Sequence, residues 1–294
     1  MNNDILAYLA ERRRVIEVAL RRYLPPPSQK PRSLHEAMGH SLFAGGKRLR
    51  PILCLAACEA VGGDYARALP LACAVECVHT YSLIHDDLPA MDDDDWRRGK
   101  PTLHKIYGEA IAILAGDALL AHAFEIACRY PGGKYGTGLV VAELARASGS
   151  RALVGGQVSD LEAEGKVISV RELRAIHLRK TGALITAALR LGAMAGEANG
   201  ESLRAVTEFG RFLGLAFQVI DDILDLTQTR ETLGKSAGKD LAAEKATYPR
   251  LLGLEGAQLT AERYTARAHG ALAPLGKGGA ILDVLAHHLL SREN

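Results

Sequence analysis

Apolar residues recur at intervals of three to four along nearly the whole chain, and no segment shows a convincing alternation of apolar and polar residues. The first pattern is typical of amphipathic helices, whereas alternation would indicate strands. Ala and Leu dominate, and aromatic residues, which favour strands, make up only 5%. The sequence therefore predicts an all-α fold with no strand and no hairpin.

Capping and breaking signals position the expected helices. Ser33 with Glu36 and Ser169 with Glu172 have the spacing of capping boxes, and Pro51 suits the first turn of a helix. We expect helices starting at Ser33 and Pro51 and helices over residues 4–23, 66–88, 108–129, 136–149, 151–165, 170–196, 201–227, 246–253, 256–272 and 278–290.

No linker-like stretch divides these helices, so the sequence predicts a single domain over residues 1–294. Residues 110–128 and 183–195 are apolar nearly all round. Helices of this kind lie inside a large bundle or at a subunit interface.

Charge and composition exclude several classes of protein. Lys and Arg number 36 and Asp and Glu 34, which gives a net charge of +2 and argues against a nucleic-acid-binding protein. No apolar run approaches the roughly 20 residues of a membrane-spanning helix, and no signal peptide is evident, so we expect a cytoplasmic protein without membrane insertion. Five cysteines (Cys54, Cys58, Cys73, Cys77 and Cys128) are interpreted as buried core residues rather than zinc ligands.

Two clusters of aspartates lie at the ends of apolar helical stretches. In the second, Asp221 and Asp225 are four residues apart and share a helix face with Gln218, while Asp222 lies about 100° round the helix. Carboxylates on one partly apolar face repel each other and are costly to desolvate. A divalent cation removes both penalties, and ligands that are all oxygen favour Mg²⁺ over zinc.

The first cluster lies within HDDLPAMDDDD at 85–95. On a straight helix Asp86 and Asp92 would lie about 240° apart, so they converge only if the helix breaks between them. Pro89 supplies the break, because proline disfavours helical conformation at the residue before it. We therefore expect a fold-back that brings Asp92 toward Asp86, with residues 93–95 as a solvated acidic rim.

Basic residues accompany both clusters, in GGKRLRP (45–51), at 97–98 and in LGKSAGKD (233–240). A metal site alone needs no such cations, whereas a bound diphosphate does. In proteins Mg²⁺ is bound by one or two carboxylates together with substrate phosphates, and Arg binds phosphate oxygens through paired hydrogen bonds. The combination predicts a phosphate ester held between metal ions and cations. His79, two helical turns before Asp86, is either a buried core histidine or a further phosphate donor.

At these residues the chain resembles the trans-isoprenyl diphosphate synthases, and among them the bacterial farnesyl diphosphate synthases. The motifs that carry the resemblance span most of the chain: GGKRLRP (45–51), HTYSLIHDDLPAMDDDDWRRGKPT (79–102), LAGDALL (114–120), GGQVSDL (155–161), HLRKTGAL (177–184), FQVIDDILD (217–225), LGKSAGKD (233–240) and KATYPRLLG (245–253). The resemblance implies an isoprenoid-synthase helical bundle around a central active-site cavity, usually in a homodimer.

The same resemblance implies roles for individual residues. Asp86 and Asp92 would coordinate two Mg²⁺ ions and Asp221 a third. Further or water-mediated metal contacts would come from Asp87, Asp222 and Asp225. The allylic diphosphate would be held by Arg97, Lys180, Thr181, Gln218 and Lys235, of which Lys180, Thr181 and Gln218 are the catalytic candidates. Isopentenyl diphosphate would be held by Lys47, Arg50, His79 and Arg98.

The implied reaction joins isopentenyl diphosphate head-to-tail to dimethylallyl or geranyl diphosphate. Metal ions and cations neutralise the leaving diphosphate, and an apolar cavity protects the allylic carbocation from water. Tyr81 and Ser82 lie about one helical turn before Asp86 and would form the floor of this cavity. A bulky Tyr81 favours the C15 product, farnesyl diphosphate, whereas related C20 synthases often carry a small or flexible residue there.

Three alternatives stay open at this point. One is a synthase of C20 or longer products. Another is a metal-dependent phosphohydrolase that uses His85 and Asp86, which would need histidine ligands near His79 or His104 and would leave the Asp221 cluster unused. A non-catalytic helical protein that binds cations would leave the basic motifs unexplained.

Overall fold

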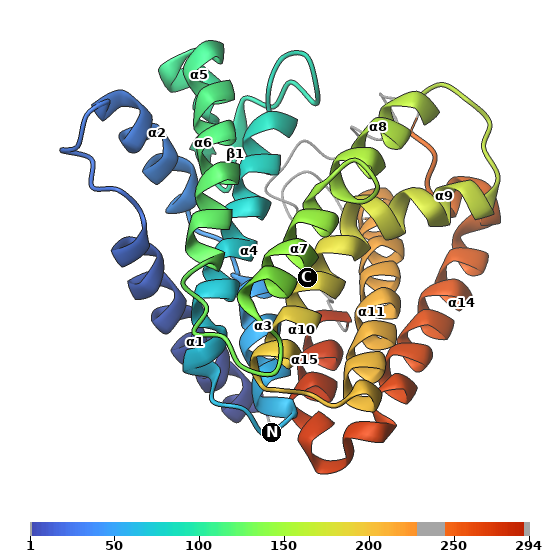
Figure 1. Cartoon of the computed structure of the whole chain (residues 1–294). Helices are drawn as coiled ribbons and strands as arrows, with labels where there is room; N and C mark the ends of the chain where they lie inside the picture. The colour runs from blue at the N-terminus through green and yellow to red at the C-terminus, as the bar shows by residue number, and fades with distance from the viewer. Residues whose placement is uncertain (1, 228–244, 291–294) are drawn as a thin grey trace.

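The computed structural model describes residues 2–227 and 245–290 (Figure 1). The helices are α1 (Asn2–Tyr23), α2 (Arg32–Leu42), α3 (Leu49–Ala60), α4 (Tyr65–Asp86), α5 (Leu103–Tyr107), α6 (Glu109–Ala127), α7 (Thr137–Ser148), α8 (Leu153–Ala163), α9 (Val170–His177), α10 (Ala183–Ala195), α11 (Gly200–Thr227), α14 (Tyr248–Ala271) and α15 (Ala280–Leu290). A π-helical turn η1 (Leu178–Gly182) joins α9 to α10, and a 3₁₀ turn η2 (Ala273–Gly279) precedes α15. The all-α fold class is confirmed.

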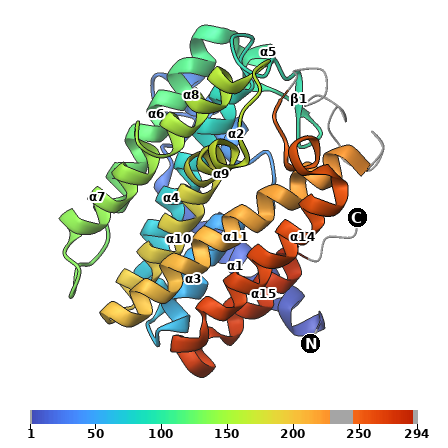
Figure 2. The same ribbon diagram turned by 90° about the vertical axis from the view of Figure 1, so that its right-hand side faces the viewer.

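Neighbouring helices pack in the succession α6, α4, α3, α10, α11 and α14. Figures 1 and 2 both show α11 running between α10 and α14. The buried side chains along this succession form one large apolar core, and a second cluster joins α9, α11 and α14. The packing holds the carboxyl end of α4, which carries the first aspartate cluster, in a fixed place relative to the rest of the bundle.

Close helix contacts in this core depend on small residues. A Cβ atom at Gly192 in α10 would lie 1.8 Å from the carbonyl oxygen of Cys54 in α3, so only glycine fits there. Cys54, Cys58, Cys73 and Cys77 are free and fully buried in α3 and α4, and burial raises the pKa of each thiol. These four cysteines therefore pack as apolar core residues, as expected. The same expectation is wrong for Cys128, which follows α6 and is exposed.

The prediction that the chain lacks strands and hairpins is wrong at one place. Strands β1 (Trp96–Arg97) and β2 (Lys100–Pro101) form an antiparallel hairpin in which Trp96 faces Pro101. Arg98 and Gly99, the two residues of the turn, have φ values of 54° and 73°. Two positive φ values are what a tight hairpin turn requires, and strands of two residues are too short to show alternation in the sequence.

One of the two predicted capping boxes is present. Ser169 and Glu172 hydrogen-bond to each other's backbone N–H groups at the start of α9, as predicted. The box predicted for Ser33 and Glu36 is wrong, because α2 begins at Arg32 and its N-cap residue Pro31 makes no side-chain cap. Ser33 therefore lies inside the first turn, where its hydroxyl cannot act as the cap.

Helix α6 bears on the expectation that no segment could span a membrane. Among residues 2–227 and 245–290, α6 is the one helix long and apolar enough to do so by length and composition. Glu109, Asp117 and Glu125 interrupt its sequence, and one side of the helix packs against α4. A core helix of a bundle passes the same test, so this is weak evidence for a membrane span.

Candidate active site

The first aspartate cluster, residues 86–95, begins where α4 ends. Asp86 is the last residue of α4, and the backbone N–H of Asp92 donates to the Asp86 carbonyl oxygen at 2.8 Å. The chain therefore leaves the helix and folds back, which confirms the break predicted at Pro89. Burial raises the pKa of Asp86 to about 6; the nearby Lys180 opposes this rise and the negative charge of Asp92 adds to it.

Asp87 is buried and faces an arginine. The Nε of Arg97 donates to Oδ1 of Asp87 at 2.7 Å, and Nη2 of the same arginine lies 2.5 Å from that oxygen. The same guanidinium lies 3.7 Å from Asp94. Asp93 and Asp95 are exposed, as expected for a solvated rim, and Asp94 is half-buried. In this arrangement Asp87 orients the side chain of Arg97, and the metal-ligand role predicted for Asp87 stays a prediction.

The second aspartate cluster, residues 221–225, lies near the end of α11. Asp221 and Asp225 are half-buried, and Asp221 lies close enough to Arg50 to act on its charge. Asp222 is buried: it accepts from the amide of Gln218 at 3.3 Å and from the backbone N–H of Tyr248 at 3.0 Å. Gln218, which the sequence places on the Asp221 face, thus contacts Asp222, four residues on.

Lys180 and Thr181 lie in the π-helical turn η1. The ammonium of Lys180 donates to Asp160 of α8 at 2.6 Å, and the hydroxyl of Thr181 donates to the Oε1 of Gln218 at 2.9 Å. A Cβ at Gly156 would lie 2.3 Å from the Lys180 backbone nitrogen, so α8 can approach η1 only with glycine there. These contacts tie the catalytic candidates to α8 on one side and α11 on the other.

The residues expected to hold isopentenyl diphosphate lie just before α3 (Lys47), on α3 (Arg50), on α4 (His79) and in the hairpin turn (Arg98). Nη1 of Arg50 lies 3.3 Å from Nε2 of His79. Burial and the adjacent Arg50 hold the pKa of His79 well below its usual value, so the imidazole is neutral and its Nε2 accepts from the arginine. Arg98 donates to the carbonyl of Gly45, and Lys47 is exposed.

Tyr81 and Ser82, the expected cavity floor, lie in the last two turns of α4. Tyr81 is 4% exposed, and its ring lies 5.8 Å from that of His85 in an edge-to-face contact. Its buried hydroxyl has no hydrogen-bond partner within the described part of the chain. Ser82 donates to the carbonyl of His79 at 3.0 Å. Tyr81 is therefore a large buried side chain. It lies close enough to Asp86 for the charge of that carboxylate to act on its hydroxyl.

His85 does not form the dyad with Asp86 that a phosphohydrolase would need. Its Nε2 lies 3.1 Å from the carbonyl oxygen of Ile113 in α6 and 3.8 Å from the carboxylate of Asp117. Its ring also fills the space beside Gly116, where a Cβ would lie 2.2 Å away. The side chain is thus directed at α6, and this alternative has no structural support.

Sequence reasoning missed two residues that the structure brings to the site. Lys245 lies 3.4 Å from Asp92 and 4.0 Å from Glu164, and Asp160 pairs with Lys180. Lys245 lies in the motif KATYPRLLG and Asp160 in the motif GGQVSDL. Both motifs carry the resemblance, so their presence was the signal that could have pointed to these two residues. Lys235, expected to hold the allylic diphosphate, lies outside the described residues.

Comparisons with known proteins identify the family of the chain. A model of the polyprenyl synthetase family matches residues 31–270. The chain belongs to the polyprenyl synthetase family. It is 48% identical over 298 residues to geranylgeranyl pyrophosphate synthase 12, chloroplastic, of Arabidopsis thaliana, an alignment that covers 99% of this chain and 82% of the relative. It is 49% identical over 288 residues to a dimethylallyltranstransferase of Fischerella ambigua, covering 97% and 83% of the two chains.

The fold comparison gives the same result. The crystal structure of geranylgeranyl pyrophosphate synthetase from Pyrococcus horikoshii superposes with a TM-score of 0.90 at 34% identity, over 99% of each chain. The isoprenoid-synthase bundle expected from the resemblance is confirmed, and so is the membership of the trans-isoprenyl diphosphate synthases. The function class is prenyl transfer with chain elongation.

Proposed function

We propose that the chain condenses isopentenyl diphosphate with allylic diphosphates and releases a C20 product, geranylgeranyl diphosphate. The observation that carries the proposal is the mixture of charges at the end of α4, where Asp86 lies in the fields of Lys180 and Arg97 and where Lys245 pairs with Asp92. Carboxylates next to lysine and arginine side chains suit a diphosphate that is bound through metal ions. The names of the relatives in Arabidopsis and Pyrococcus support the C20 product.

The donor set at the two aspartate clusters fits Mg²⁺. Asp86, Asp92 and Asp221 offer only carboxylate oxygens, which hard divalent cations prefer. Burial and the neighbouring carboxylates raise the pKa of Asp86, and a bound cation would relieve this crowding. In this proposal Asp86 and Asp92 hold two ions and Asp221 a third. Bound Mg²⁺ supplies charge neutralisation at the departing diphosphate.

The cations of the chain bind and orient the two diphosphates. In this proposal the allylic diphosphate is held by Arg97, Lys180 and Lys235, as the resemblance implies, and also by Lys245. Thr181 and Gln218 are hydrogen-bonding partners. Lys180 is held by Asp160 at 2.6 Å, so its ammonium is fixed before substrate arrives. Such preorganised charges favour the transition state, because they need no rearrangement as the diphosphate leaves.

Isopentenyl diphosphate is assigned to Lys47, Arg50, His79 and Arg98. Burial lowers the pKa of Arg50 and of Arg98, so a bound diphosphate would stabilise the charged form of both guanidinium groups. His79 acts here by accepting from Arg50 and fixing its direction rather than by carrying charge.

A C15 product is the second candidate, and one observation favours it. Tyr81 is fully packed about one turn below Asp86, next to Ser82, where a growing chain would meet its ring. A side chain of this volume would stop elongation at farnesyl diphosphate if the ring kept its place.

A product assay decides between the two lengths. Purified protein would be incubated with isopentenyl diphosphate, Mg²⁺ and either dimethylallyl or geranyl diphosphate, and the dephosphorylated products separated by chromatography. Accumulation of C20 alcohol supports the proposal, and C15 alcohol that resists further elongation supports the second candidate. Folded protein that gives neither product would overturn the function itself.

We also propose a homodimer that forms through α6, α7 and α8, which lie on one face of the molecule (Figures 1 and 2). Large apolar side chains are exposed on this face: Ile113, Leu114, Leu139, Val154 and Val158. Leu114→Glu should shift the mass measured by light scattering to that of a monomer, and Leu259→Glu on α14 is the matched control. A dimeric L114E variant would contradict the proposed face.

The remaining expectations stay predictions. These are one polyprenyl synthetase domain over residues 1–294, a cytoplasmic location and the absence of a nucleic-acid partner. The Arabidopsis relative is named as chloroplastic, so fractionation of cells that express the full chain is the measurement that tests the location.

A further inference from the structure

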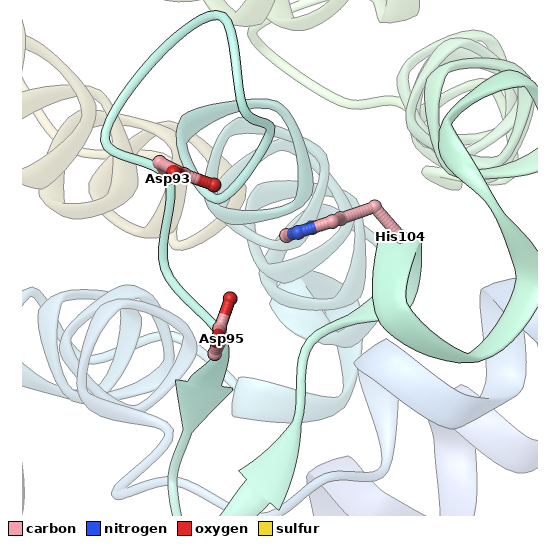
Figure 3. A group of neighbouring side chains, drawn as sticks. All are labelled: Asp93, Asp95 and His104. Carbon is pink, nitrogen blue, oxygen red and sulfur yellow. The ribbon is translucent and has the colours of Figure 1, made fainter.

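Asp93, Asp95 and His104 converge beside the β-hairpin (Figure 3). Their ligand atoms all lie within 4.8 Å of one another. Figure 3 shows the imidazole reaching from the start of α5 toward the gap between the two carboxylates. None of the three belongs to the residues assigned above to Mg²⁺ or to a diphosphate.

The histidine is the informative member of this group. His104 is 7% exposed, and its buried Nε2 has no hydrogen-bond partner among the residues that the structure describes. Leaving a buried polar atom unsatisfied costs roughly 1–3 kcal/mol. The other nitrogen, Nδ1, lies 3.3 Å from the hydroxyl of Thr102. A metal-binding imidazole is commonly oriented through its second nitrogen in this way.

The backbone holds the two aspartates in place. The N–H of Asp93 donates to the carbonyl of Leu88 at 3.2 Å, and the carbonyl of Asp95 accepts from the N–H of Thr102 at 3.0 Å. The second bond closes the base of the hairpin, directly before the strand pair Trp96–Pro101. The two aspartates are therefore held in place beside His104 by hydrogen bonds that do not depend on an ion.

The charge at this place also favours a cation. Lys105 lies 2.7 Å from Oδ1 of Asp95, and the carboxylates of Asp95 and Asp93 raise the pKa of this lysine. Lys105 is largely exposed, and a lysine on the surface can move away at small cost. A divalent ion would place two positive charges where the lysine now places one.

We propose that Asp93, Asp95 and His104 bind one divalent first-row transition metal ion, such as Mn²⁺ or Co²⁺. One imidazole nitrogen with two carboxylate oxygens suits these ions better than Mg²⁺, which prefers oxygen alone. Both carboxylates are exposed, so water completes the coordination. The ion would join the end of the first aspartate cluster to α5 and hold the hairpin between them. This site is independent of prenyl transfer.

Pulsed electron paramagnetic resonance of bound Mn²⁺ tests the proposal, because it detects nitrogen coordinated directly to the ion. The full chain would be loaded with one equivalent of Mn²⁺ without diphosphate. We expect a ¹⁴N coupling, since the residues assigned to Mg²⁺ offer only oxygen. Its absence from the wild-type protein would overturn the proposal.

Variants assign the signal to this site. His104→Asn should abolish the ¹⁴N coupling, whereas His287→Asn, an exposed histidine on α15, should retain it. Asp95→Asn should weaken Mn²⁺ binding at the nitrogen-coordinated site at least tenfold and serves as the second variant if H104N fails to fold. Coupling that persists in folded H104N, or unchanged affinity in D95N, would contradict the assignment.

Discussion

The ammonium of Lys245 lies 3.4 Å from the carboxylate of Asp92. Three residues later, the backbone N–H of Tyr248 donates to Asp222 at 3.0 Å. The short segment 245–248 therefore contacts both aspartate clusters, one through a side chain and the other through the backbone. This arrangement brings a lysine that follows the second cluster to the acids of the first.

Replacing Lys245 should weaken binding of the allylic diphosphate. Lys245→Gln removes the charge and keeps most of the length, so we expect KM for geranyl diphosphate to rise about tenfold, the effect of one charge-assisted hydrogen bond. Steady-state kinetics at saturating isopentenyl diphosphate measure it. Lys166→Gln, an exposed lysine after α8, is the control. An unchanged KM in K245Q would show that the ion pair with Asp92 is only structural.

On the second candidate, the C15 synthase, the volume of Tyr81 should set the product length. Tyr81→Ala opens space below Asp86, so the average product should lengthen by at least one five-carbon unit, as measured by chromatography of the dephosphorylated products. Tyr81→Phe is the matched control, because it keeps the ring and removes only the unpartnered hydroxyl. Identical product distributions in Y81A and the wild type would refute the floor assignment for Tyr81.

Much of the fold could be predicted because it depends on local signals. The apolar spacing predicted the long helices, and Pro89 predicted the break that returns the Asp92 backbone to Asp86. These features need only the helical period and the stereochemistry of proline. The same reasoning placed Asp221 and Asp225 on one helix.

The missed features either are too short to show a pattern or depend on contacts between distant segments. The hairpin turn at Arg98 and Gly99 has too few strand residues to show a pattern. The pairing of Lys180 with Asp160 spans 20 residues, and that of Lys245 with Asp92 spans 153. The apolar spacing of the sequence does not encode such pairs. Each forms only when the fold brings its two segments together: α8 with η1 in the first pair, and the segment before α14 with the first aspartate cluster in the second.

Gly192 should be essential to the contact between α10 and α3. Gly192→Ala places a methyl group against the Cys54 carbonyl, so the two helices must separate. We expect a loss of about 2–3 kcal/mol in the free energy of unfolding, measured by urea denaturation. Gly270→Ala, in a helical position of α14 with nothing within 4 Å, should instead stabilise by about 0.5–1 kcal/mol. A G192A variant as stable as wild type would show that the helices can shift freely.

His177 should make stability depend on pH. It is 7% exposed, its ring lies 5.6 Å from that of Tyr248, and burial lowers its pKa to about 4. The unfolded chain binds the proton near pH 6.5 and the folded chain only near 4. Stability from the neutral form is therefore complete above pH 6.5 and is lost as the pH falls toward 4.

The expected loss between pH 7.5 and 5 is about 2 kcal/mol for this group alone. His79 is half-buried, and its pKa is also lowered, so it acts in the same direction. The comparison must therefore be made between variants. His177→Phe keeps a ring against Tyr248 and cannot titrate, and its unfolding free energy should fall less over this range than that of the wild type. His287→Asn, which removes an exposed histidine, should leave the wild-type dependence unchanged. Equal pH dependence in H177F and the wild type would mean that folding does not lower the pKa of His177.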